Sequence, residues 1–131
     1  NLPQAMQGLA VVPIFAGYDS NRDTGRLFQF DVTGGRYEEQ DFATSGSGSL
    51  HAGTVIKLGF RSNLTTEEAL RLAVKALWHA ADEDSATGGP DPIRGIYPVL
   101  SVITADGFRQ LTDDESGEVF SEFREELNGG E

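Results

Sequence analysis

The segment from Thr65 to Asp82 constrains the fold most, because its pattern predicts one long amphipathic helix. Thr65 and Glu68 have the spacing of a capping box, in which each side chain bonds the other residue's backbone N–H. The apolar residues that follow share one helical face, and half of them are alanine: Leu70, Ala73, Val74, Leu77, Ala80 and Ala81. So many small residues predict close packing against a flat partner such as a sheet.

The segments before this helix read mainly as strands. Leu9–Phe15 is a short apolar run that predicts a buried strand, with Pro13 typical of an edge or bulge. Leu27–Val32 alternates apolar and polar residues, turns at Thr33-Gly34-Gly35 and returns over 36–44, which predicts a hairpin. Residues 50–60 have helical spacing weakened by glycine and β-branched residues.

A second hairpin and a last helix are expected after residue 95. Residues 96–104 are strand-like and lead through Asp106-Gly107 into 108–111. Thr112 and Glu115 repeat the capping-box spacing ahead of another amphipathic stripe. Strands and helices thus occur in blocks, which favours an α+β fold over alternating βαβ units.

Composition excludes several functions. The 131 residues are about the length of one domain, and 38% hydrophobic residues suffice for a core. The net charge of −11 argues against nucleic acid or an anionic membrane as a partner, since both attract clustered Lys and Arg. With no cysteine, disulfides, thiolate metal sites and cysteine nucleophiles are excluded.

The N-terminal stretch has features of neither a membrane span nor a secretory signal. Residues 1–18 lack charged side chains but are interrupted by Pro, Gln and Gly, and no basic segment precedes them. The first residue is Asn rather than Met, so we expect further sequence upstream of Asn1.

Two polar loops are candidates for chemistry. The Gly46–Ser49 loop lies between a strand and a possible helix, but its spacing fits neither a Walker loop nor a dinucleotide fingerprint. Acidic residues at 82–84 oppose the helix dipole, so they are either solvated or face a cation. The residues alone leave open a flexible turn for the first loop and solvation for the second. The ligand pattern of an EF-hand is not met, and we expect no metal and no cofactor.

Several strings, taken together and in order, resemble the bacterial, actinobacterial-type proteasome core-particle β subunit over essentially the whole chain. The strings are Ala5-Met-Gln-Gly-Leu9, Ala16-Gly-Tyr-Asp19, Phe30-Asp-Val-Thr-Gly-Gly35, Ser45-Gly-Ser-Gly-Ser-Leu50, Asp84-Ser-Ala-Thr-Gly-Gly-Pro-Asp91 and Arg94-Gly-Ile96. The resemblance implies the N-terminal-nucleophile hydrolase fold, a four-layer α/β/β/α sandwich. Residues 1–131 match its second half, the C-terminal portion of a single β-type domain, so unpaired strand edges are expected.

The resemblance also implies a mechanism and residue roles. In the family, an N-terminal threonine attacks the peptide carbonyl and its own α-amine acts as base. Asp84 matches the acid near that nucleophile, Thr87 stands where relatives have Ser, and Ser47 matches the serine that contacts the amine. Asp19 matches an acid that lines a neighbouring subunit's substrate pocket. The nucleophile and its activating acid and lysine belong to the first half of the pattern, and Asn1 cannot replace the threonine.

The hypothesis from the sequence is therefore a β subunit of a cytoplasmic threonine endopeptidase that degrades unfolded proteins in a closed chamber. The implied partners are other β subunits in a heptameric ring, proteasome α subunits and a ring ATPase that delivers substrates. A non-catalytic structural subunit of the same assembly is the alternative. A small acidic α+β binding domain is a third, unrelated possibility.

Overall fold

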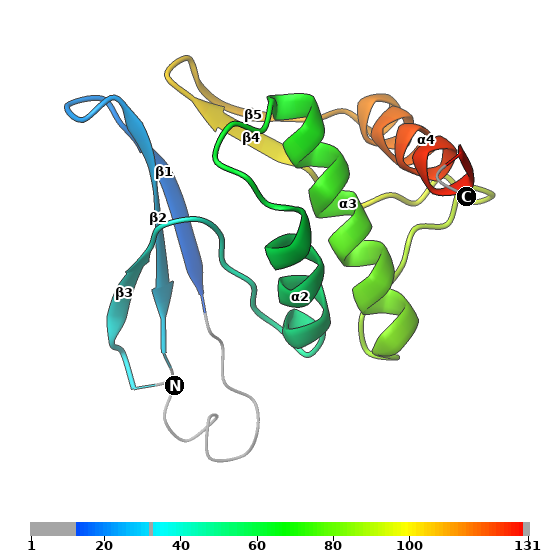
Figure 1. Cartoon of the computed structure of the whole chain (residues 1–131), viewed down its shortest axis with the longest axis horizontal. Helices are drawn as coiled ribbons and strands as arrows, with labels where there is room; N and C mark the ends of the chain where they lie inside the picture. The colour runs from blue at the N-terminus through cyan, green and yellow to red at the C-terminus, as the bar shows by residue number, and fades with distance from the viewer. Residues whose placement is uncertain (1–12, 32, 130–131) are drawn as a thin grey trace. The chain divides into compact units, whose positions relative to one another are not determined.

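The structure, a computed structural model, describes residues 13–31 and 33–129. They form two compact units (Figure 1). The first holds the described residues up to Gly46 together with Ile103–Gly107, and the second holds Ser47–Val102 and the chain from Phe108 onward. Three strands come first, followed by two helices, two strands and a last helix, which confirms the predicted mixed helix and strand content in blocks.

The first unit contains an antiparallel sheet in the order β1-β2-β3. The strands are β1 (Ile14–Asp19), β2 (Thr24–Phe30) and β3 (Arg36–Glu39). The hairpin around Gly34 is confirmed, and Gly34 has a φ of +92° that favours glycine. The return strand ends at Glu39 rather than Thr44, and the Gln29 side-chain amide instead donates to the Thr44 carbonyl at 2.9 Å. Residues 9–12 of the predicted first strand lie outside the described residues.

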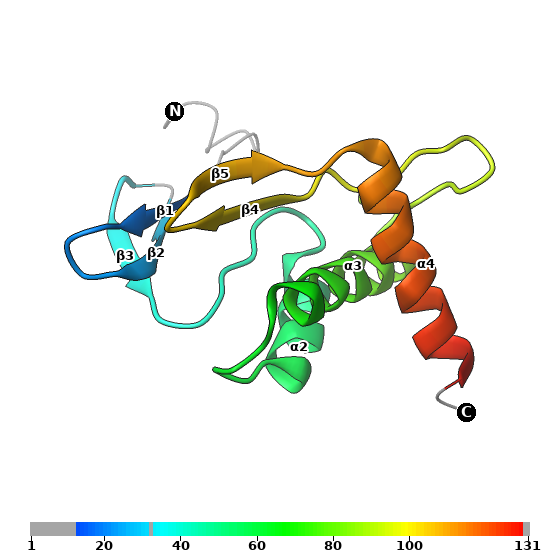
Figure 2. The ribbon, with the colours of Figure 1, turned by 90° about the horizontal axis from the view of Figure 1, so that it is seen from above.

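The second unit is built around α3 (Thr66–Glu83), which packs against α2 (Ser49–Gly59) and α4 (Asp113–Gly129) (Figures 1 and 2). Both predicted capping boxes are present at Thr65 and Thr112. The main core joins α3 and α4 with the residues on either side of the second hairpin: Val74, Leu100, Leu111, Val119, Phe120 and Phe123.

The sequence predicted that the alanines of α3 pack against a sheet. For Ala80 this prediction is wrong, because its packing partner is a helix. Ala76 and Ala80 are 2% exposed and pack with Ala52 of α2, so the close approach is helix against helix. Because alanine side chains are small, the backbones of α2 and α3 can approach each other closely. Residues 50–60, whose pattern was ambiguous, are helical as α2.

The second hairpin is shorter than expected. β4 (Ser101–Thr104) pairs with β5 (Gly107–Gln110), and Gly107 has a φ of +109°. Residues 97–100 are irregular, because Pro98 supplies no N–H to a strand ladder. No helix in the described part of the chain is both long and apolar enough to cross a membrane.

Candidate functional site

Ser47, Asp84 and Thr87 meet at the end of α3, although 37 residues separate the first two. The Ser47 hydroxyl donates to Asp84 Oδ2 at 2.5 Å, and the Thr87 hydroxyl donates to the same oxygen at 2.6 Å. Two hydroxyls therefore bind one carboxylate oxygen. We call Ser47, Asp84 and Thr87 the carboxylate cluster.

The backbone at the end of α3 fixes the position of Asp84. Asp84 caps the helix, its N–H donating to the Ala80 carbonyl at 2.8 Å, and Thr87 N–H returns to the Asp84 carbonyl at 3.0 Å. Asp84 Oδ1 accepts a long bond of 3.4 Å from Ala86 N–H. Because a carboxylate offers about four acceptor sites, this oxygen retains capacity for another donor.

The site is electronegative. Carbonyl groups at a helix C-terminus carry partial negative charge, and the last turn of α3 contains no basic residue. Asp82 and Glu83 are exposed, as expected if these two acids are solvated. Asp84 is half-buried, so solvation does not account for it. The arrangement therefore attracts a cation. In residues 13–31 and 33–129, no three His, Cys, Asp or Glu are grouped so that they could hold a metal ion.

Two glycines shape the loop that delivers Ser47. Gly46 has a φ of +105°, a conformation that side chains other than glycine rarely adopt. Gly48 is buried at the N-cap of α2, and a Cβ there would lie 2.6 Å from Thr87 Oγ1 and 3.1 Å from the Ala80 Cβ. The G-S-G string is thus a packing requirement of the cluster rather than a flexible turn.

The hydrogen bonds from Ser47 and then Thr87 hold the pKa of Asp84 below its ordinary value, against the opposing effect of burial. The positive charge that His51 can carry acts in the same direction. His51 lies in the first turn of α2, three residues after Gly48. The sequence analysis assigned no role to His51, and only the fold brings its charge to bear on Asp84.

This lowered pKa gives a pH-dependent prediction for stability. A carboxyl whose pKa is lower in the folded state stabilises the fold above its unfolded pKa, near 3.8 for Asp, and loses that contribution as pH falls through the folded pKa. We expect Asp84→Asn to lower the thermal midpoint at pH 7, and the difference from wild type to shrink below about pH 4. Thermal unfolding of both proteins between pH 7 and pH 2.5 checks this. A difference that is constant across the range contradicts it.

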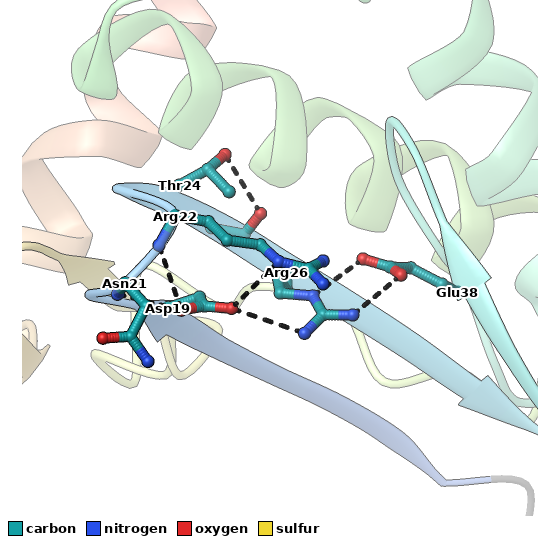
Figure 3. A network of polar contacts seen from close by, with 7 residues as sticks. Asp19, Asn21, Arg22, Thr24, Arg26 and Glu38 are labelled. Atoms are coloured by element: carbon teal, nitrogen blue, oxygen red, sulfur yellow. Dashed lines mark hydrogen bonds and ion pairs between the residues drawn. The ribbon is translucent and has the colours of Figure 1, made fainter.

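Asp19 belongs to the first unit and is engaged in a polar network (Figure 3). Asp19 Oδ1 accepts from the N–H groups of Asn21 and Arg22 at 3.0 and 3.2 Å, and Oδ2 lies 3.4 Å from Arg26. Arg26 also binds Glu38 with two bonds of 3.0 Å. The carboxylate of Asp19 therefore organises the β1–β2 turn, and it has charged partners within its own unit.

The pKa of Asp19 is affected in two directions. Burial raises it, whereas the N–H groups of Arg22 and Asn21 and the charges on Arg22 and Arg26 lower it, and the lowering prevails. Arg26 and Glu38 were not predicted from the sequence as part of this network. Their cross-strand contact follows from the β2–β3 register, in which Phe28 pairs with Glu38. Arg26 is two residues before Phe28 in β2, so its side chain lies on the same face of the sheet as Glu38.

Comparison with known proteins defines the class first. A family profile described as "Proteasome subunit" matches residues 2–93, which include Asp19 and the carboxylate cluster. This family has the N-terminal-nucleophile hydrolase fold, and the helices and strands of this chain fit part of such an α+β sandwich. The chain belongs to the proteasome subunit family.

Similar curated proteins are named "Proteasome subunit beta". The protein of Streptomyces griseus is 60% identical over 119 residues, 91% of this chain and 42% of that protein. The protein of Acidothermus cellulolyticus is 56% identical over 123 residues, which are 91% of this chain and 42% of that protein. The protein of Frankia casuarinae is 53% identical over 115 residues, which are 88% of this chain and 42% of that protein. The chain thus spans less than half the length of these relatives.

Proposed function

We propose that this chain is the C-terminal portion of a β-type proteasome subunit, a threonine endopeptidase. Its relatives bear that subunit name, and the matched part is 42% of their length. In this proposal the nucleophilic threonine belongs to the part of the β-type subunit that the matched 42% does not cover. Residues 1–131 supply the groups that hold that threonine in place.

The observation that carries the proposal is the free acceptor capacity of the carboxylate cluster. The hydroxyls of Ser47 and Thr87 donate to Asp84, so their lone pairs remain available, as does most of Asp84 Oδ1. An ammonium has three donors and one positive charge, and these three residues offer acceptors beside a negative helix end. The cluster is therefore suited to a terminal amine.

The chemistry follows from the pKa of an α-amine, which is about 7.7–8.0 when unperturbed. An amine in this range is partly neutral at physiological pH and can accept the proton of its own residue's hydroxyl as that oxygen attacks a peptide carbonyl. The role of Asp84 is to stabilise the resulting ammonium. Ser47 and Thr87 orient the amine and keep Asp84 ionised.

For Asp19 we propose the family role of lining a neighbouring subunit's substrate pocket. Its salt bridges to Arg22 and Arg26 support a carboxylate held in one orientation. The proposed partners are other β subunits in a heptameric ring, α subunits, and a ring ATPase that delivers unfolded protein, all in the cytoplasm. Exposed large apolar side chains such as Phe15, Leu58 and Phe108 support burial of further surface in an assembly.

The test is to incubate assembled particles with a fluorogenic peptide and an epoxyketone inhibitor. Turnover together with a covalent adduct on a β-chain threonine supports the threonine endopeptidase. Assembly without turnover or adduct supports the alternative, a non-catalytic structural subunit of the same ring. Intact-mass spectrometry of the native subunit adds an independent check: a species of 14.1 kDa that begins at Asn1 contradicts the proposal.

A further inference from the structure

Arg26 lies on one face of the antiparallel sheet together with two acidic residues. Residues that pair directly in antiparallel strands point to the same face, and the face alternates along each strand. Arg26 pairs with Gly17 of β1, and Asp19 is two residues further along that strand, so Arg26 and Asp19 share a face. Glu38 of β3 is on this face as well. Because Gly17 has no side chain, the Arg26 guanidinium has room to reach Asp19.

One guanidinium joins these two carboxylates. Arg26 Nε and Nη2 donate to the two oxygens of Glu38, each at 3.0 Å. Its Nη1 donates to Asp19 Oδ2 at 3.4 Å, so the guanidinium lies between the two acids (Figure 3). A bidentate arginine–carboxylate pair has a defined geometry. Glu38 therefore fixes the direction in which Arg26 presents Nη1 to Asp19.

An aromatic ring orders the same guanidinium. The Arg26 Cζ lies 5.0 Å from the centroid of the Phe28 ring, within the range of a cation–π interaction. The side chain of Arg26 is 28% exposed, whereas that of Arg22, the other cation near Asp19, is 63% exposed. Arg26 is thus the ordered counter-charge of Asp19, and Arg22 is a solvated one.

The two oxygens of Asp19 are held in different ways. Oδ1 accepts from two backbone N–H groups of the β1–β2 turn. Oδ2 has the side chains of Arg26 at 3.4 Å and Arg22 at 3.7 Å. Without Arg26, this oxygen would depend on the exposed Arg22, and Glu38 would lose its bidentate partner. Two acids would then face one arginine, so the surface around Asp19 would change from charge-balanced to acidic.

We propose that Arg26 is a positioning residue for Asp19 in substrate binding, and that it makes this part of the substrate pocket favour uncharged side chains over basic ones. Arg26 holds Asp19 Oδ2 and balances its charge, while the Asp19 side chain stays 21% exposed and can meet a ligand. The inference rests on the proposed role of Asp19 in lining a neighbouring subunit's substrate pocket. It goes further in naming the residue that sets the charge of that lining, and therefore which side chains the lining accepts.

A charge-balanced wall offers little to a lysine of the substrate. A lysine that enters a pocket loses hydration, and a net negative charge nearby is needed to offset this loss. The charge of Asp19 is already offset by Arg26. An uncharged side chain loses far less hydration, so it is favoured at this wall.

The test compares assembled particles of intact wild-type subunits with particles of Arg26→Met, which removes the charge and keeps an unbranched side chain. The probes are fluorogenic tetrapeptides that carry either lysine or methionine at one position, with each of the four positions taken in turn. We expect Arg26→Met to raise the lysine-to-methionine ratio of kcat/KM by about 5-fold or more at one position, because the wall gains one net negative charge. Arg26→Lys, which restores the charge, should return most of the wild-type ratio.

Two further variants separate this role from a general effect on the sheet. Arg36→Met is the matched control and should leave the ratio unchanged, since Arg36 lies over the same Phe28 ring at 5.1 Å but, among the described residues, forms no ion pair with Asp19. In an Asp19→Asn background, Arg26→Met should change the ratio far less than it does in wild type. If Arg26→Met does not assemble, Arg26→Gln carries the same expectation.

A ratio that Arg26→Met leaves unchanged at every position overturns the inference. An equal change in the Asp19→Asn background overturns it too, because Arg26 would then not act through Asp19. A uniform fall in kcat/KM for all peptides shows that Arg26 only supports the sheet, and it has the same consequence.

Failure of the proposed function would be visible separately. Equilibrium binding of fluorescein-labelled peptides that end in a reduced, non-hydrolysable amide gives the lysine-to-methionine ratio without turnover. Particles that hydrolyse no peptide, but bind the lysine peptide better in Arg26→Met, contradict the endopeptidase and leave the inference intact. Active particles whose ratio is insensitive to Arg26 contradict the inference alone.

Discussion

Asp84→Asn in the assembled particle is expected to lower kcat for peptide hydrolysis by about 100-fold or more, with a much smaller change in KM. The substitution keeps the size of the side chain but removes the negative charge that would stabilise the threonine ammonium. An amide oxygen in the place of Asp84 Oδ2 can still accept from both Ser47 and Thr87, but the NH2 group then replaces Oδ1 and offers no acceptor to the amine.

The pH profile separates this role from a purely structural one. Loss of the Asp84 charge should lower the pKa of the amine, so the acidic limb of the kcat/KM profile should move to lower pH. Glu83→Gln is the matched control, since Glu83 is the exposed neighbour at the same helix end and should leave both kcat and the profile unchanged. An Asp84→Asn enzyme with the wild-type rate and profile would remove Asp84 from the site.

Gly48→Ala is expected to destabilise the fold by about 1–3 kcal/mol and to reduce activity together with stability. A methyl group at this position would lie 2.6 Å from Thr87 Oγ1 and 3.1 Å from the Ala80 Cβ. Because Gly48 is buried, the Thr87 hydroxyl must move and its bond to Asp84 is strained. Urea unfolding and peptide hydrolysis measure the two effects.

Gly88→Ala is the control for this glycine. It neighbours Thr87, yet a Cβ there meets nothing within 4 Å, so we expect stability to be unchanged or slightly raised. If Gly48→Ala is as stable and active as Gly88→Ala, the close packing of the Ser47 loop on α3 is wrong.

Local patterns predicted the elements whose cause is local. The capping boxes at Thr65 and Thr112 place donor and acceptor three residues apart, so the sequence suffices to predict both helix starts. The glycine turns at Gly34 and Gly107 similarly predicted two hairpins. The ends of strands were less predictable. β3 ends at Glu39 rather than at residue 44, and β4 begins at Ser101 rather than at residue 96. A strand extends only as far as its neighbour pairs with it, and the strand's own sequence does not specify that neighbour.

The candidate site also has features that the sequence predicted and features that depend on the fold. Residues alone marked the acidic end of α3 and the G-S-G loop as unusual, and only the resemblance joined Ser47, Asp84 and Thr87. The sequence did not predict that Gly48 is required for packing, nor that His51 influences Asp84. Both effects depend on the approach of α2 to α3. The helix partner of Ala76 and Ala80 was missed for the same reason.

The sequence by itself determined the charge of −11, the absence of cysteine chemistry, the α+β order and the start of each capped helix. The tertiary structure decided the geometry of the site, in which a serine and an aspartate 37 residues apart share a hydrogen bond of 2.5 Å. The physical reason is range: caps and turns are set by neighbours within a few residues, whereas this contact exists only where two helix ends are packed together.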